Sequence, residues 1–212
     1  MKPATLAGLG LVIVGAALVL AQRVGVPPSI APRPSAQDVF TDTVTHFSLA
    51  KPAGWWMTAG PTLRQQAEAE ARQRGDTRLA PSGGEPIELL VRFTRYGPGE
   101  APGPNPTIVV TRFDLRRFPP GTRPDDLLRI GIASARPEST PTTVELGRRP
   151  WRKIIASRDL SRPDGATLTT LQEVYVTAGA SRGLGIVISA TRSQYVEYRS
   201  AFDALLGSVR FQ

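Results

Sequence analysis

The sequence of 212 residues contains no cysteine and only one histidine, His46. Without cysteine the protein has no disulfide, no thiol nucleophile and no acylated N-terminal cysteine of the lipoprotein type. One histidine is also too few for a zinc site of the usual kind. The sequence therefore predicts a fold that is stabilised by an ordinary apolar core, and it predicts neither a metal nor a cofactor.

Charge is also missing from residues 5–21, which follow Lys2 and are almost entirely apolar. As a helix this stretch would be about 26 Å long, close to the thickness of a bilayer core. A signal peptide cleaved after Ala21 fits the small side chains there, whereas Arg23 and the lack of a polar region before it favour an uncleaved anchor. Both alternatives predict export: an anchor in the bacterial inner membrane with the bulk on the periplasmic side, or secretion to the periplasm.

A proline-rich stretch, residues 22–37, is typical of an extended, semi-rigid linker. The residues after it are enough for one domain that buries about 70% of its unfolded surface. The predicted organisation is an anchor or signal peptide over 1–21, a linker over 22–37 and a single domain over 38–212. The net charge of +8 favours an acidic partner or anionic lipid head groups as the contact of this domain.

Hydrophobic periodicity alternates between the two-residue repeat of strands and the 3.6-residue repeat of helices. Strands are predicted at residues 47–52, 87–94, 107–113, 142–146, 151–159, 167–177, 184–191 and 208–211. Helices are predicted at residues 61–74, 123–133 and, after a capping box at Thr191 and Gln194, up to Gly207. The pattern predicts an α+β fold: a mostly antiparallel sheet covered by a few amphipathic helices and preceded by the N-terminal hydrophobic helix.

Two short motifs stand at the ends of this domain. The first reads Phe47-Ser-Leu-Ala-Lys-Pro-Ala-Gly-Trp55, and the second reads Tyr198-Arg-Ser-Ala-Phe202-Asp-Ala-Leu-Leu-Gly-Ser-Val-Arg-Phe211. Together with the order of the elements they resemble the PsbP-like superfamily, which includes PsbP, DcrB, LpqN and the Ran-binding Mog proteins. The resemblance covers nearly all of residues 45–212. It implies an αβα sandwich and a role in binding or assembly, because that superfamily shares no catalytic residues. The chain departs from LpqN-type relatives in lacking a lipobox cysteine.

Patterns that could carry catalysis have simpler interpretations. Gly179-Ala-Ser181-Arg-Gly183 matches the Gly-x-Ser-x-Gly pattern of hydrolases, which requires a strand–turn–helix context and a histidine after the serine. Here a predicted strand follows, and His46 lies far upstream, so a hairpin loop is the better interpretation. The adjacent pair Asp125 and Asp126 fits the positive end of a helix. The sequence therefore predicts a protein that is not an enzyme.

Basic residues gather in two places, and both lie beside aromatic residues. Arg112, Arg116 and Arg117 surround two phenylalanines, and a second cluster occupies residues 148–153. Arginine beside an aromatic ring could stack on nucleic-acid bases, but export argues against a nucleic-acid partner. Solvated turns and edge-strand protection are the ordinary interpretations of such runs. We nevertheless expect the second cluster to contact a partner, with Trp151 as its anchor. Strand alternation places Trp55 inside and Trp56 outside. The candidate partner-binding residues are Trp56, Arg148, Arg149, Trp151, Arg152 and Lys153.

Three functions remain open at this point. The first is a membrane-tethered or exported, non-catalytic binding or assembly module of the bacterial cell envelope, with a protein or an anionic lipid surface as its partner. The second is a periplasmic protein that binds a small ligand or a lipid between its sheet and helices. The third, an enzyme, lacks the nucleophile, base and metal sets that the chemistry would need.

Overall fold

The computed structural model describes residues 39–65, 86–98, 100–101, 103–133, 135–161 and 167–212. The predicted leader and the predicted linker lie outside these residues. So does most of the helix predicted at 61–74, of which residues 61–65 are described and are helical. Within the described part of the chain, no helix combines the length and the apolar character that crossing a bilayer requires.

Antiparallel strands are the main secondary structure of the described chain. They are β1 (Val39–Asp42), β2 (Phe47–Ala50), β3 (Trp56–Ala59), β4 (Ile87–Thr94), β5 (Thr107–Asp114), β6 (Arg136–Pro137), β7 (Thr142–Leu146), β8 (Arg149–Ser161), β9 (Thr167–Ala178), β10 (Arg182–Thr191) and β11 (Arg210–Phe211). The helical segments are a 3₁₀ turn η2 (Leu115–Arg117), α3 (Pro124–Gly131), α4 (Arg192–Glu197) and α5 (Arg199–Gly207).

These strands form two sheets. The main sheet has eight strands in the order β3-β4-β5-β10-β9-β8-β6, with β7 paired to the other part of the long strand β8. The small sheet has the order β1-β2-β11, so the C-terminal strand closes onto the first strands of the domain. Arg112 of β5 joins the two sheets through its guanidinium, which lies 2.6 Å from Asp42 of β1 and 2.6 Å from Glu88 of β4.

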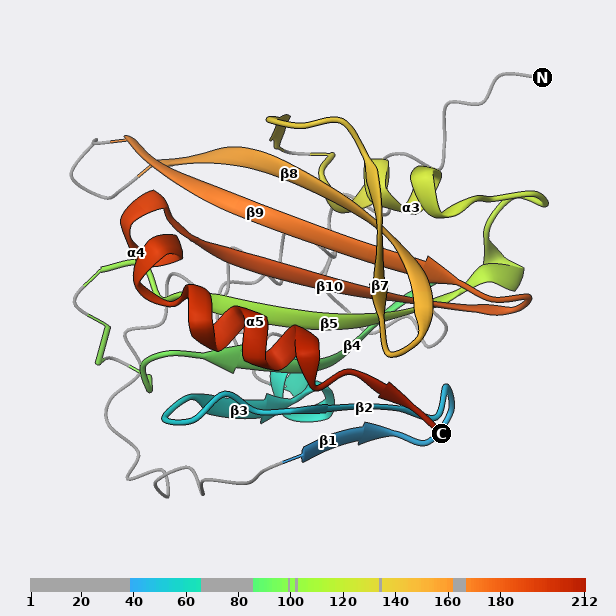
Figure 1. Ribbon diagram of the computed structural model, residues 1–212, viewed down its shortest axis with the longest axis horizontal. Coiled ribbons are helices and arrows are strands. Elements are labelled where there is room, and N and C mark those ends of the chain that lie inside the picture. The colour runs from blue at the N-terminus through green and yellow to red at the C-terminus, as the bar shows by residue number, and fades with distance from the viewer. Residues whose placement is uncertain (1–38, 66–85, 99, 102, 134, 162–166) are drawn as a thin grey trace.

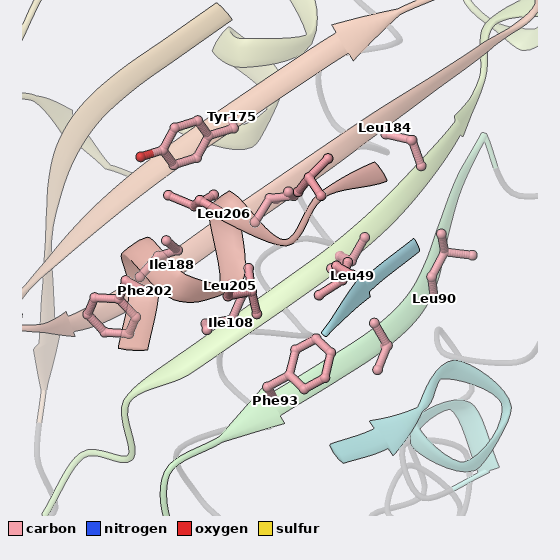
Figure 2. Close-up of a cluster of buried hydrophobic side chains, with 14 of the residues drawn as sticks. Leu49, Leu90, Phe93, Ile108, Tyr175, Leu184, Ile188, Phe202, Leu205 and Leu206 are labelled. Atoms are coloured by element: carbon pink, nitrogen blue, oxygen red, sulfur yellow. The ribbon is translucent and has the colours of Figure 1, made fainter. Parts of the chain in front are cut away.

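The main sheet is packed on both faces. On one face α5 lies over β5 (Figure 1), and its side chains Phe202, Leu205 and Leu206 pack in one cluster with Ile108 and Ile188 (Figure 2). On the other face α3 covers a second apolar cluster built from β5, β8, β9 and β10. The buried members of that cluster are Ile87, Phe113, Leu127, Leu128, Ile132, Ile154, Ala156, Val174, Val176 and Val187.

The α+β class and the large antiparallel sheet are confirmed, whereas the N-terminal hydrophobic helix stays a prediction. The strand at 142–146 has the predicted limits, and Thr191 and Gln194 form the predicted capping box. The C-terminal helix is the main difference, because it is broken at Tyr198 into α4 and α5. The ring of Tyr198 stands edge-on to Trp55, at 6.0 Å between centroids, and its hydroxyl lies 2.9 Å from that of Tyr96. These contacts fix the residue at which the helix changes direction.

Candidate binding surface

The basic cluster at 148–153 begins in a tight hairpin turn. Leu146 pairs with Arg149, so the loop between β7 and β8 consists of Gly147 and Arg148 alone. Both loop residues have positive φ, 60° and 62°, which is the backbone of a type I′ turn. Such a turn matches the twist of the two strands, and it holds Arg148 out in solvent.

The turn lies against the C-terminal strand. A side chain at Gly147 would come within 3.0–3.1 Å of Val209 and Phe211, so only glycine fits this approach. The guanidinium of Arg149 stacks over the Phe211 ring at 3.9 Å. Nη1 of Arg210 donates to the carbonyl of Val209 at 2.6 Å, the same carbonyl that the turn approaches. The β7–β8 hairpin therefore lies beside the C-terminal strand, and both segments carry arginines. Figure 1 shows the hairpin close to the C-terminus.

We call Arg148, Arg149 and Arg210 the arginine tip. All three residues are exposed, and none forms an ion pair with a carboxylate of the described residues. Elsewhere on the surface, arginines such as Arg129 and Arg199 have a carboxylate at 2.7–3.0 Å. The arginine tip is therefore a site of uncompensated positive charge, and the Phe211 ring supports the guanidinium of Arg149.

The next two predicted residues are occupied inside the protein. Arg152 points toward α3, where its Nε lies 2.6 Å from Oδ1 of Asp125 and its Nη1 donates to Thr143 at 2.8 Å. The hydrogen bond from Arg152 holds the pKa of Asp125 below its usual range. Lys153 points to the opposite face, where its Nζ lies 2.9 Å from Oε1 of Glu173. Neither cation is available to a partner in the way that the arginine tip is.

The prediction that Trp151 anchors a partner at the surface is wrong. Its side chain has no exposed surface, and it packs between Phe47 and Phe211 with ring centroids 6.4 Å from each. Its Nε1 donates to the carbonyl of Leu146 at 3.2 Å, so even its polar atom is satisfied internally. Alternation along β8 explains the error, because Trp151 faces the core beneath the hairpin while Pro150 and Arg152 face the other side.

Trp56 agrees with the predicted alternation, and it lies apart from the other candidate residues. Trp55 is 1% exposed and lies in the core against Phe202, whereas Trp56 is half-buried on β3. Strand β3 is at one end of the main sheet, and the β7–β8 hairpin is at the other. The structure therefore does not bring Trp56 to the arginine tip, and the two cannot form one continuous contact surface.

The other basic cluster is also largely compensated. Asp114 has three arginines around it: Arg116 at 2.8 Å, Arg182 at 3.0 Å and Arg117 at 3.6 Å. The hydrogen bond from Arg116, helped by the other charges, holds the pKa of Asp114 well below its usual range. The Gly-x-Ser-x-Gly segment provides Arg182 here, and it is a turn between β9 and β10, as predicted, closed by a 2.8 Å bond between Gly179 and Arg182.

Sequence reasoning missed a buried polar cluster around Glu173 of β9, which is 2% exposed. Tyr175 donates to one carboxylate oxygen at 2.5 Å, and Lys153 and Arg199 lie 2.9 Å and 3.8 Å from the other. Tyr195 of α4 also bonds to this carboxylate. A carboxylate inside a strand of otherwise apolar and β-branched residues was a visible signal, but its partners come from distant segments and could not be identified.

Burial alone would raise the pKa of Glu173. The hydrogen bonds from Tyr175, Tyr195 and Lys153 outweigh that effect, so the pKa of this carboxyl lies below its usual range. Burial and the neighbouring carboxylate raise the pKa of Tyr175 above its usual range, so its hydroxyl remains a donor. This cluster is closed and satisfied, and it fastens α4 and α5 to the sheet.

Comparisons with known proteins find no matching family model and no matching curated protein. Among solved structures, the chain is similar to cyanobacterial PsbP (CyanoP) from Synechocystis sp. PCC 6803, with TM-score 0.48 and 11% identity over 89% of this chain and 98% of that one. It is also similar to LpqN, involved in cell envelope biogenesis of Mycobacterium tuberculosis, with TM-score 0.45 and 12% identity over 84% of this chain and 86% of that one.

A third similar structure, from Bacteroides thetaiotaomicron VPI-5482, has TM-score 0.41 and 11% identity, and the match covers 84% of this chain but 49% of that one. PsbP and LpqN are also two of the types that the sequence motifs resemble. Identities of 11–12% say nothing of what this chain binds.

Proposed function

We propose that this protein is a non-catalytic binding module on the outer side of a bacterial inner membrane, and that its arginine tip binds an acidic segment of a protein partner. The observation that carries the proposal is the uncompensated charge of Arg148, Arg149 and Arg210, none of which pairs with a carboxylate of the described residues. The tether or export signal is the apolar stretch at 5–21.

The geometry of the tip supports a carboxylate as the group that it binds. A guanidinium presents parallel N–H donors that match the two oxygens of a carboxylate. The contact of Arg149 with the Phe211 ring, 3.9 Å from Cζ to the ring centroid, restrains this side chain and so lowers the conformational entropy that binding would otherwise cost. Arginine and aromatic residues are also the types that dominate the binding energy of protein interfaces. The tip thus combines charge with a prepared orientation.

Crosslinking in native membranes tests this proposal. A photoreactive residue in place of Pro150, which is exposed beside the tip, should capture an acidic protein from the full-length chain. The triple variant R148E, R149E, R210E should lose that capture. A matched control, R64E, R129E, R192E, changes the net charge equally at exposed positions and should retain it.

Three outcomes contradict the proposal. Capture that survives in the tip variant would show that these arginines are not the contact. Equal loss in both triple variants would show that overall charge, and not the tip, attracts the partner. Crosslinks that go only to lipid would replace the acidic protein by an anionic membrane surface.

Membrane attachment needs its own test, because the leader lies outside the described residues. If residues 5–21 are an uncleaved anchor, the full-length protein should sediment with inner membranes, and deletion of this stretch should leave it in the cytosol. If they are a signal peptide, mass spectrometry of the mature protein should find an N-terminus after Ala21. A full-length protein that stays in the cytosol would contradict both forms of the proposal.

A further inference from the structure

A row of residues, most of them polar, crosses the face of the main sheet on which α3 lies. The strand registers place its members directly opposite one another, from the edge strand β3 to β8. The members of this row are Trp56, Thr94, Thr107, Ser189, Gln172 and Ala156. Thr107, Gln172 and Ser189 are 2–5% exposed, so this is a polar strip in a buried position.

One buried donor in this strip has no acceptor. Nε2 of Gln172 is buried and has no hydrogen-bond partner among the described residues. By contrast, the side-chain amide of Gln194 donates to the carbonyl of Pro104 at 2.8 Å. Buried polar groups in folded proteins almost always have a partner, so an amide left without one indicates a missing acceptor.

A second donor lies diagonally across from the first. Arg158 of β8 pairs in register with Thr170, two residues from Gln172 on the same face of β9. Diagonal neighbours of this kind have Cα atoms about 7–8 Å apart, within reach of two long side chains. Arg158 is half-buried, and no carboxylate of the described residues forms an ion pair with it. Burial, with no carboxylate to offset it, lowers the pKa of this guanidinium.

We propose that Gln172 and Arg158 form a binding site for the oxyanion of a small ligand, a carboxylate or a phosphate group. Nε2 of Gln172 has no acceptor and the Arg158 guanidinium has no carboxylate partner among the described residues, so the ligand must supply acceptor oxygens. A negative charge beside it stabilises a guanidinium that is partly removed from water. An anion therefore suits this site better than a neutral ligand.

The surroundings limit the size of this ligand on one side. In the direction of α3, the next row of the same face includes Val109, Val187, Val174 and Ile154, all buried, and the last three belong to the apolar cluster that α3 covers. Close packing leaves no room there for an acyl chain. The site therefore suits a small anion better than a fatty acid, and it does not depend on the arginine tip.

Selective labelling of glutamine with ¹⁵N gives a direct test on the full-length protein in detergent micelles. On titration with inorganic phosphate or with acetate, the side-chain amide signal of Gln172 should shift and then saturate. The amide of Gln194 is an internal control, because its donor is already bonded to Pro104. The signal of Gln172 is identified by its loss in Q172L, and the probe that saturates at the lower concentration identifies the chemical class.

Variants separate this site from general charge effects. R158M should abolish the saturable shift, whereas R129M, which removes an exposed arginine of α3, and the triple tip variant should retain it. If R158M fails to fold, R158K keeps the charge but loses the planar fork, and it should weaken binding at least several-fold. A signal of Gln172 that does not saturate, or that moves in parallel with Gln194, would overturn the proposal.

Discussion

Two consecutive residues of β9, Gln172 and Glu173, are both 2% exposed, yet they point to opposite faces of the sheet and have opposite environments. Glu173 faces α4 and α5 and accepts bonds from tyrosine and lysine side chains. Gln172 faces the other way, and its amide donor has no partner among the described residues. Both are polar groups in a strand that is otherwise made of apolar and β-branched residues.

The difference shows that burial and polarity alone do not identify a site. A buried polar group with all its bonds made is part of the scaffold, as Glu173 is where it fastens α4 and α5. A buried polar group with a bond missing is a candidate for binding, because a ligand can supply what the protein does not. On the sheet face that α5 covers, the buried Glu173 has all its bonds made. On the face that α3 covers, the buried amide of Gln172 lacks one.

The largest effect should come from E173L. Removing the carboxylate leaves Lys153 and Tyr175 without their acceptor inside the protein. Breaking a buried pair in this way costs about 3–5 kcal/mol, and we expect the lower end because the side chain of Lys153 is 20% exposed. Urea unfolding measures the change. The control E145L, at an exposed position on β7, should change stability by less than about 0.5 kcal/mol. Equal effects of the two substitutions would refute a structural role for the cluster.

Acid should remove the contribution of Glu173. Its pKa in the folded protein lies below the ordinary value of 4.5, so the folded state favours the charged carboxylate. A depressed folded pKa gives stability that is fully present above the unfolded pKa and is lost as the pH falls through the folded pKa. The stability difference between the wild type and E173Q should therefore be constant near neutral pH and shrink below about pH 4.3. A stability difference that grows as the pH falls would mean that the pKa of Glu173 in the folded protein is raised and not lowered.

The sequence predicted most strands because half-buried strands alternate visibly, as in Ile87 to Thr94. It predicted the start of α4 because Thr191 and Gln194 carry the chemistry of a capping box. It missed β1, β3 and β6, which have two to four residues and too few positions to show a period. The break at Tyr198 was equally invisible, since it depends on contacts with Trp55 and Tyr96, which come from distant segments of the chain.

The candidate site was predictable only in part, for the same physical reason. Arg148 and Arg149 follow a glycine in a turn between two strands, so their exposure was correctly expected. Arg210 joined them only because the C-terminal strand returns to the hairpin, which is a tertiary contact. The inward face of Trp151 depends on register along β8. A one-residue change in register reverses every side chain, and composition does not set it.

A smaller effect should come from Y175F. This substitution removes one donor, 2.5 Å from Glu173, but leaves Lys153 and Tyr195 to satisfy the carboxylate. A hydrogen bond to a charged group contributes about 1.5–3 kcal/mol, and we expect the lower end because the other donors remain. A double-mutant cycle with E173Q isolates the coupling. If Y175F costs the same in the E173Q background as in the wild type, the two residues act independently.

The smallest effect on the unliganded protein, and one of opposite sign, should come from Q172L. Removing a buried donor that has no partner relieves a desolvation penalty, so stability should be unchanged or rise by about 1 kcal/mol. The control T170V lies on the same face and loses a 3.3 Å bond to the carbonyl of Arg158, so it should lower stability by about 0.5–1.5 kcal/mol.

Thermal unfolding with added phosphate or acetate tests whether the face with Gln172 binds a ligand. A ligand that binds only the folded state raises its stability, so the wild type should gain and Q172L should not. If Q172L lowers stability without any ligand, the amide of Gln172 already has a partner. Gln172 would then be part of the scaffold, as Glu173 is.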